Sequence, residues 1–323
     1  MIILGLNHGE INSSAAIIKE GEVIAGSSEE RYTRLKKTKA FPINSVKYCL
    51  NELDIKITDC DFIAQAWNPY ASLTKYNPQI SGYRNKREDY FYSIPDNLFN
   101  LLDNRKPKDW SVIHFEDNML PPIYYVQHHR AHAANSFYLS PYENAAVLIV
   151  DWRGEFETST MYAGKGNKLE LLSSQEMPHS LGLLYATYTE LLGYRPDSDE
   201  WKVMALSAFD IDYKNEYEKI KSTVQLLDNG FFEMDQAYYK GALSDQPNLY
   251  TQKLVELLGG RIGVKGEVAD DWHKKITCAI QQISEDIALH MLDKLYKKTQ
   301  SENLVLGGGF FMNSVFNGKI KAL

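Results

Sequence analysis

The chain has 323 residues, of which 44% are hydrophobic and 24% are charged, and its formal net charge is −7. This composition is that of a globular protein and excludes a disordered, collagen-like or purely coiled-coil chain. The length suits two domains or two halves of one large fold. The mildly acidic balance argues against a protein that coats nucleic acid, because binding to many phosphates needs a clustered positive surface.

The three cysteines, Cys49, Cys60 and Cys278, show neither metal-binding nor disulfide spacing, so the simplest compartment is a reducing cytoplasm. The apolar start MIILGLNHGE lacks a basic leader and a cleavage site, and it predicts a strand rather than a signal peptide. Nowhere do about 18 apolar residues run uninterrupted, so no membrane span is expected.

Two stretches of the chain carry the same pattern of three β-rich segments separated by turns. The expected strands lie at 2–6, 14–19 and 23–27 in the first copy and at 145–150, 159–163 and 169–172 in the second. A duplicated unit of this kind, followed by helices, predicts an α/β fold of two ribonuclease-H-like halves, as in the sugar kinase, actin and heat-shock chaperone superfamily. On this pattern alone, two unrelated three-stranded meanders remain an equal alternative.

Helices are expected between these strands. Pro42 stands at a plausible first helical position, and apolar residues follow it at helical spacing. These residues are Val46, Cys49, Leu50 and Leu53. A longer helix is expected at about 272–298, where isoleucines, a methionine and a leucine form one stripe.

The domain boundaries follow from the duplication. The first half is expected at 1–140 and the second at 141–323. Residues 68–120 and 211–268 mix polar and aromatic side chains without a clear period, and we interpret them as insertions on the two halves. Substrate selectivity could lie in such segments, because binding residues are often carried on loops.

The segment YVQHHRAHAA predicts a metal site. His128 and His132 are four residues apart, so on a helix they share a face, which suits two imidazoles on one metal ion. Asp151 follows the first strand of the second copy, and a strand end beside a helix is where α/β sites form, so its carboxylate could be a third ligand. Such a set fits iron(II) or zinc. The alternative is that the histidines line a helix and Asp151 begins a turn.

The segment LVLGGGFFMN, residues 304–313, predicts a buried strand that enters three glycines and then a helix. Glycines let the backbone approach an anion or a nucleotide, and a helix start offers unpaired N–H groups. A plain tight turn explains the same pattern equally well.

Taken together, these residues resemble the NodU/CmcH-type O-carbamoyltransferases along nearly the whole chain. The matching motifs are LGLN near the start, EERYTRLK, HHRAHAANSFYLSPYENAAVLIVD, PHSLGLLY, LLGYRPDSDEWKVMAL and LVLGGGFFMNSVFNGKI. The resemblance implies an amino-terminal domain similar to the TsaD-type proteins, which transfer a threonylcarbamoyl group to tRNA. It also implies that carbamoyl phosphate and ATP form carbamoyl adenylate, whose carbamoyl group then passes to a hydroxyl of a small molecule or nucleotide.

The resemblance also assigns roles to residues of this chain. It implies a metal, usually iron, on His128, His132 and Asp151. The residues that it places around the adenylate are Gly182, Lys202, Gly308, Gly309 and Asn313. The family usually shows His-Asp where this chain has Ile11 and Asn12. In the family this histidine is the candidate for the base that accepts the proton of the acceptor hydroxyl. In this chain the candidates for that role are His8 and Glu10.

Relatives of this type continue beyond the helix that follows the glycines, with a further strand, an Asp-rich loop and a YrdC-like domain that activates carbamoyl phosphate. Because this chain stops at Leu323, we expect a second half that is incomplete at its carboxyl end. The chain would then be a fragment, a proteolysed chain or one component of a split enzyme completed by a separate chain. An uncovered sheet edge would also favour association, including a homo-oligomer.

Three hypotheses for the function follow. The leading one is the transfer domain of an O-carbamoyltransferase that uses ATP and carbamoyl phosphate as co-substrates. The second is a nucleotide-binding or regulatory module without catalysis, and the third is a TsaD-like tRNA modifier, which the acidic balance disfavours. The motifs do not identify the acceptor.

Overall fold

The computed structural model describes all residues except 10–11, 70–93, 96, 99–119, 241–247 and 321–323. Most of the expected insertion at 68–120, together with Glu10, therefore lies outside the described residues. The described residues divide into two compact units, one up to His128 and the other from His129 onward.

The first unit contains a five-stranded sheet in the order β3-β2-β1-β4-β5. Its strands are β1 (Ile2–Asn7), β2 (Ser14–Lys19), β3 (Glu22–Ser28), β4 (Phe62–Gln65) and β5 (Ile123–Tyr125). The first three strands form an antiparallel meander, β4 runs parallel to β1, and β5 runs parallel to β4. This order and these directions are those of a ribonuclease-H-like sheet. The first three strands lie where the sequence predicts them, to within about one residue at each end.

One face of this sheet carries the core of the first unit. Along β1 and β4 every second side chain is buried, because successive strand residues point to opposite faces. Leu4, Leu6 and Ile63 pack there with the helix α2 (Ile43–Asn51). This helix is the one that the spacing after Pro42 predicts.

The cap of α2 comes from a residue that is distant in sequence. Pro42 occupies the N-cap position and makes no side-chain cap hydrogen bond. Instead the buried Glu29 carboxylate, just before the short helix α1 (Glu30–Thr33), accepts hydrogen bonds from the backbone N–H groups of Asn44 and Ser45 at 3.1 and 2.9 Å. The Ser45 hydroxyl also donates to it at 3.0 Å. A negative charge at a helix start satisfies unpaired donors and interacts favourably with the helix dipole.

The second unit repeats the topology. Its four-stranded sheet has the order β11-β6-β7-β8. The strands are β6 (Asn144–Val150), β7 (Glu157–Lys165), β8 (Lys168–Glu176) and β11 (Leu304–Gly307). Strands β6, β7 and β8 form an antiparallel meander, and β11 runs parallel to β6. This confirms the duplicated α/β pattern. Among the described residues, no strand takes the place beside β11 that β5 has beside β4.

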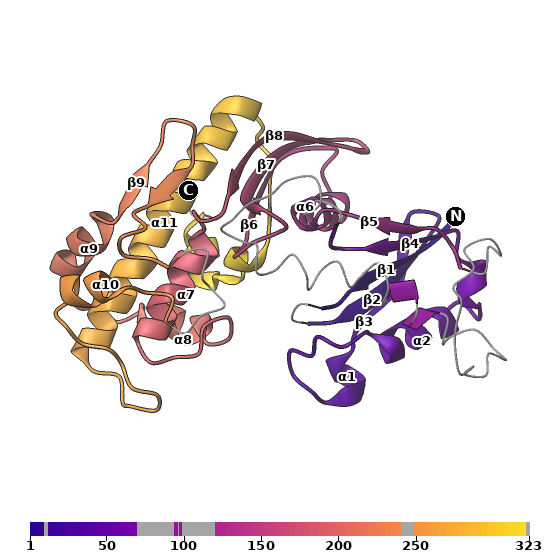
Figure 1. The fold of residues 1–323 in the computed structure, drawn as a ribbon. Coiled ribbons are helices and arrows are strands. Elements are labelled where there is room, and N and C mark those ends of the chain that lie inside the picture. The colour runs from indigo at the N-terminus through magenta and orange to yellow at the C-terminus, as the bar shows by residue number, and fades with distance from the viewer. Residues whose placement is uncertain (10–11, 70–93, 96, 99–119, 241–247, 321–323) are drawn as a thin grey trace. The chain divides into compact units, whose positions relative to one another are not determined.

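Helices cover both faces of the second sheet (Figure 1). They are α6 (His128–Tyr138), α7 (Leu181–Leu191) and α11 (Asp271–Thr299). Val147 and Ile149 of β6 point to the face that α6 covers, whereas Leu148 and Val150 point to the face of α7 and α11. The near-continuous burial of β6 follows from this two-sided cover.

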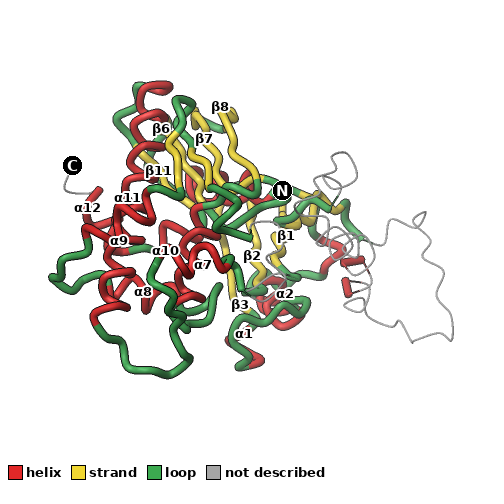
Figure 2. The backbone as a smooth tube through the Cα atoms, turned by 60° about the vertical axis from the view of Figure 1, so that its left-hand side comes forward, coloured by secondary structure: helices red, strands yellow, loops and turns green. Residues whose placement is uncertain are grey.

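Further helices gather on the α11 side of the sheet (Figure 2). The remaining elements of this unit are α8 (Glu200–Leu206), α9 (Lys214–Lys221), β9 (Val224–Leu226), β10 (Phe232–Met234), α10 (Gln252–Leu257), the 3-10 helix η5 (Gly309–Met312) and α12 (Ser314–Ile320), and the first unit also contains the 3-10 helix η1 (Ile57–Asp59). The expected insertion at 211–268 contains α9, the β9–β10 hairpin and α10. None of the described helices is both long enough and apolar enough to cross a membrane.

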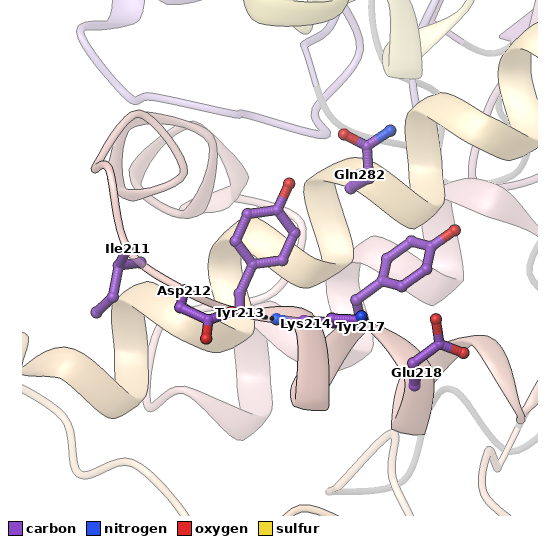
Figure 3. Close-up of a pocket in the computed structure, with 7 residues that line it drawn as sticks. All are labelled: Ile211, Asp212, Tyr213, Lys214, Tyr217, Glu218 and Gln282. Atoms are coloured by element: carbon purple, nitrogen blue, oxygen red, sulfur yellow. Dashed lines mark hydrogen bonds between the residues drawn. The ribbon is translucent and has the colours of Figure 1, made fainter.

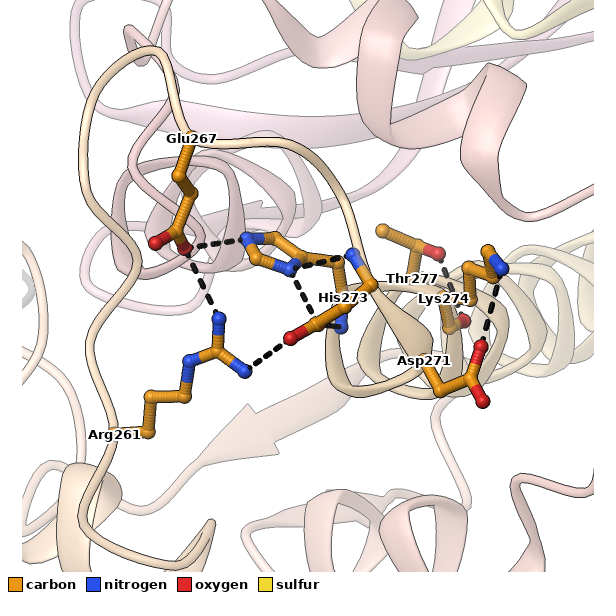
Figure 4. A network of polar contacts seen from close by, with 7 residues as sticks. Arg261, Glu267, Asp271, His273, Lys274 and Thr277 are labelled. Carbon is orange, nitrogen blue, oxygen red and sulfur yellow. Dashed lines mark hydrogen bonds and ion pairs between the residues drawn. The ribbon is translucent and has the colours of Figure 1, made fainter.

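A polar network fixes the start of α11 (Figure 4). Asp270 is the N-cap residue, and the His273 ring lies 2.8 Å from Asp270 through Nδ1 and 2.9 Å from Glu267 through Nε2. Arg261 binds Asp270 and Glu267 at 2.6 and 3.3 Å. The Arg261 hydrogen bond, followed by that of His273, holds the pKa of Asp270 well below its usual range. The long helix therefore begins one residue before the predicted start.

Candidate metal and transfer site

The structure brings the three expected metal ligands together. His128 is the first residue of α6, His132 lies one turn later, and Asp151 directly follows β6. One possible ligand atom from each residue lies within 4.8 Å of the others. The His132 Nε2 atom is 3.1 Å from the Asp151 Oδ2 atom. All three residues are partly exposed.

The turn that carries Asp151 is held by backbone contacts. The Asp151 Oδ1 atom accepts a hydrogen bond from the Trp152 N–H at 2.7 Å, which leaves Oδ2 toward His132. The Ser180 hydroxyl donates to the Trp152 carbonyl at 2.6 Å and accepts from the Leu183 N–H at 3.1 Å. Ser180 is thus the N-cap of α7, and it also ties α7 to the aspartate turn.

Three glycines allow close packing around this turn. A Cβ atom on Gly182 would lie 2.6 Å from the Trp152 Cα, and one on Gly309 would lie 3.0 Å from the Asp151 Oδ1. Gly308 has φ of +92°, and a Cβ there would overlap the Val150 carbonyl. Side chains other than hydrogen are therefore excluded at Gly182 and Gly308 without a backbone shift. The glycine turn and the start of α7 both lie against the end of β6.

Asn313 and Lys202, both expected near the adenylate, have different surroundings. Asn313 is 8% exposed, and its side chain exchanges two hydrogen bonds with Gln281, of 2.9 and 3.2 Å. Its Oδ1 also accepts from the Phe316 N–H at 3.1 Å, so Asn313 holds the segment that follows the glycines. Lys202 is in the first turn of α8 and pairs with Asp199 at 3.1 Å.

The partners of Asn313 form a buried network that the sequence reasoning missed. Gln281 accepts a hydrogen bond from the Tyr185 hydroxyl at 3.0 Å and donates to Glu285 at 2.8 Å. Glu285 pairs in turn with Lys319 at 2.5 Å. Burial raises the pKa of the Tyr185 hydroxyl, so it stays protonated as the donor. The available signal was the pair of polar residues, four apart, on the predicted long helix.

His8 lies in the first unit, directly after β1. It is 4% exposed, and its ring contacts that of Phe41 with 5.2 Å between centroids. Burial lowers the pKa of His8 to about 4. The ring is therefore neutral at neutral pH, which is the form that can accept a proton.

A separate groove of about 380 Å³ lies where the start of α9 meets α11 (Figure 3). It is lined by Ile211, Asp212, Tyr213, Lys214, Tyr217, Glu218 and Gln282. The Tyr217 hydroxyl donates to Asp286 at 2.8 Å, which fixes one wall. None of the expected site residues is among those that line it, although the groove lies partly in the expected insertion at 211–268.

Strand order, duplication and site define an α/β protein of two ribonuclease-H-like halves, with a candidate metal cluster at the end of β6. The family model described as "Carbamoyltransferase N-terminus" matches residues 2–323, so the chain belongs to this family. The family that the motifs indicate is thereby confirmed.

The curated relatives are longer than this chain. It is 29% identical to the uncharacterized protein sll1178 of Synechocystis, over 98% of this chain and 52% of that protein. It is 28% identical to the nodulation protein NolNO of Sinorhizobium fredii, over 96% of this chain and 42% of that protein. The chain therefore spans about half the length of these relatives. Among solved structures, HypF of T. kodakarensis is similar with a TM-score of 0.44 and 11% identity, covering 99% of this chain and 44% of that one.

Proposed function

We propose that this chain is the transfer domain of an ATP-dependent O-carbamoyltransferase. In this proposal a carbamoyl group passes from carbamoyl adenylate to a hydroxyl of a small molecule or nucleotide. Family membership supports carbamoyl transfer. The observation that carries the assignment to this chain is the convergence of His128, His132 and Asp151 beside the glycine turn.

The donor set suits a bound metal. Two imidazole nitrogens and one carboxylate oxygen that lie within 4.8 Å of one another can close around one ion, and this combination fits Fe²⁺ or Zn²⁺. A metal bound there would act as a Lewis acid toward the carbamoyl or phosphate oxygens. The Trp152 N–H, by holding Oδ1 of Asp151, orients the other carboxylate oxygen toward His132.

The remaining chemistry falls to groups of the chain itself. The acceptor oxygen bonds to the carbamoyl carbon, the bond from that carbon to the phosphate oxygen of AMP breaks, and the hydroxyl proton passes to a base. The backbone of Gly308 and Gly309, which have no side chains in the way, would hold the phosphate of the leaving AMP. His8, neutral at neutral pH, is our candidate for the base.

The test is a transfer assay with labelled carbamoyl phosphate, ATP and a panel of small hydroxylated molecules and nucleosides, with tRNA as a separate arm. It is run with the chain alone and with the carboxyl-terminal half of a longer relative added. We expect labelled small-molecule product in the complete mixture, and none with Asp151→Asn. Transfer by Asp151→Asn at the rate of the unaltered chain would contradict the site. Labelled tRNA would favour the tRNA modifier, and nucleotide binding without any turnover would favour the regulatory module.

A further inference from the structure

Gln65, the last residue of β4, is a buried polar side chain without a hydrogen-bond partner. Its exposed fraction is 0%, and neither Oε1 nor Nε2 is bonded to any residue that the structure describes. A buried carboxamide loses its hydrogen bonds to water and regains nothing from the protein, so it lowers stability. Native proteins retain such a group where a bound molecule completes its bonds or where function requires it.

The neighbours of Gln65 place it at a ligand-binding position of the sheet. Gln65 pairs with Leu6 of the parallel strand β1, and the buried His8 directly follows that strand. Two residues beyond the end of β4 lies the buried Trp67, whose indole stacks on the His128 ring with centroids 3.9 Å apart. The carboxyl ends of parallel strands are where α/β sheets bind ligands.

The chemistry of a primary amide limits the kinds of ligand that the Gln65 side chain can bind. A glutamine side chain offers a carbonyl acceptor and an N–H donor in one plane. It can therefore pair with another primary amide in which each N–H faces the other's carbonyl oxygen. A carbamoyl group carries the same pair, a carbonyl oxygen and an NH₂, so the two form a pair of parallel hydrogen bonds. A phosphate or carboxylate could use only the donor, because it has no hydrogen to give. The surroundings are neutral at neutral pH, since the His8 ring is uncharged and the adjoining core is apolar.

We propose that Gln65 binds the carbamoyl group of the substrate through this pair of hydrogen bonds and so distinguishes it from other acyl groups. The assignment rests on the proposed carbamoyl transfer. It makes Gln65 a specificity-determining residue, because an acetyl group of the same size lacks the NH₂ and leaves the Gln65 carbonyl unpaired. A site built around a hydrogen bond rejects the analogue that cannot make it.

Carbamoyl phosphate and acetyl phosphate test the proposal, since they differ only in NH₂ against CH₃. Their dissociation constants are measured by calorimetry on the full chain, on Gln65→Met and on the control Gln175→Met. Methionine keeps the length of the side chain and removes both polar ends. Gln175 is a buried glutamine of the second unit whose amide donates to the Phe232 carbonyl. We expect the unaltered chain and Gln175→Met to prefer carbamoyl phosphate by about 10- to 100-fold. The preference should fall to about onefold in Gln65→Met.

A second measurement separates binding from a structural role. Without ligand, Gln65→Met should unfold at an equal or higher urea concentration than the unaltered chain, because the unpaired amide is gone. If Gln65→Met kept the preference, the inference would be overturned while carbamoyl transfer stood. Loss of stability with the preference intact would mean that Gln65 binds a buried water, and would overturn it as well. An unaltered chain without any preference would overturn the inference, whereas the proposed transfer from carbamoyl adenylate is tested separately by the transfer assay.

Discussion

The buried His8 gives a stability prediction whose size follows from the structure. Burial lowers the pKa of this imidazole from 6.5 to about 4 in the folded chain. In the unfolded chain the ring binds a proton as pH falls through its ordinary pKa, but the folded chain does not until about pH 4. Protonation therefore favours unfolding in this window. The shift corresponds to about 3 kcal/mol of unfolding free energy, lost at up to about 1.4 kcal/mol per pH unit between pH 6.5 and 4.

Urea unfolding from pH 7.5 to 4, on the unaltered chain and on His8→Gln, measures this loss. Carboxylates contribute to the pH dependence of both proteins, so subtracting one curve from the other isolates His8. We expect a constant difference above pH 7, and a relative loss of about 3 kcal/mol by the unaltered chain on reaching pH 4. Parallel curves over the whole range would refute the argument that His8 is buried and neutral. A difference in unfolding free energy above pH 7 has no bearing on the argument, because only the change of that difference with pH reports on His8.

Three substitutions probe the packing of the two units. Gly182→Ala places a methyl group against the Trp152 backbone and should destabilise the chain by about 1–3 kcal/mol. The control Gly318→Ala, whose Cβ would have no atom within 4 Å, should be neutral or stabilising by up to about 1 kcal/mol. Equal urea midpoints for these two variants would contradict the close approach at Gly182. Glu29→Ala removes the cap of α2 and should cost about 2 kcal/mol in the same assay; unchanged stability would show that the cap contributes nothing.

The sheets could be read from the sequence because their signals are local. β-rich segments bounded by turn residues mark each strand of the two meanders, and their repetition reveals the duplication. The glycines after Leu306 likewise mark the end of β11. The helix α2 was predicted from apolar spacing, but its cap was not. Glu29 is 15 residues from Asn44 in the chain, and no spacing rule connects a carboxylate to a helix start at that distance.

Part of the candidate site could also be predicted, because its signals are local in the sequence. His128 and His132 share a helix face by their separation alone, and Asp151 could be placed at a strand end. What sequence could not show is the contact of Gly182 with the Trp152 backbone, since it depends on how α7 packs against the end of β6. The position of Gln65 did leave a signal. It is a polar residue in an inward place of the alternating run FIAQAW, where an apolar side chain would be expected.

Metal binding by the His128, His132 and Asp151 cluster is the central claim, and one titration tests it most directly. The chain is prepared without oxygen, freed of metal and titrated with Fe²⁺ and with Zn²⁺, and the bound ion per chain is determined by mass spectrometry. We expect a single ion on the unaltered chain and on the control His290→Gln, whose histidine lies on α11 and contacts the Leu227 carbonyl. His132→Gln and Asp151→Asn should remain folded and bind no ion at the same concentrations. A chain that takes up no metal, or variants that bind it as well as the unaltered chain, would contradict the account.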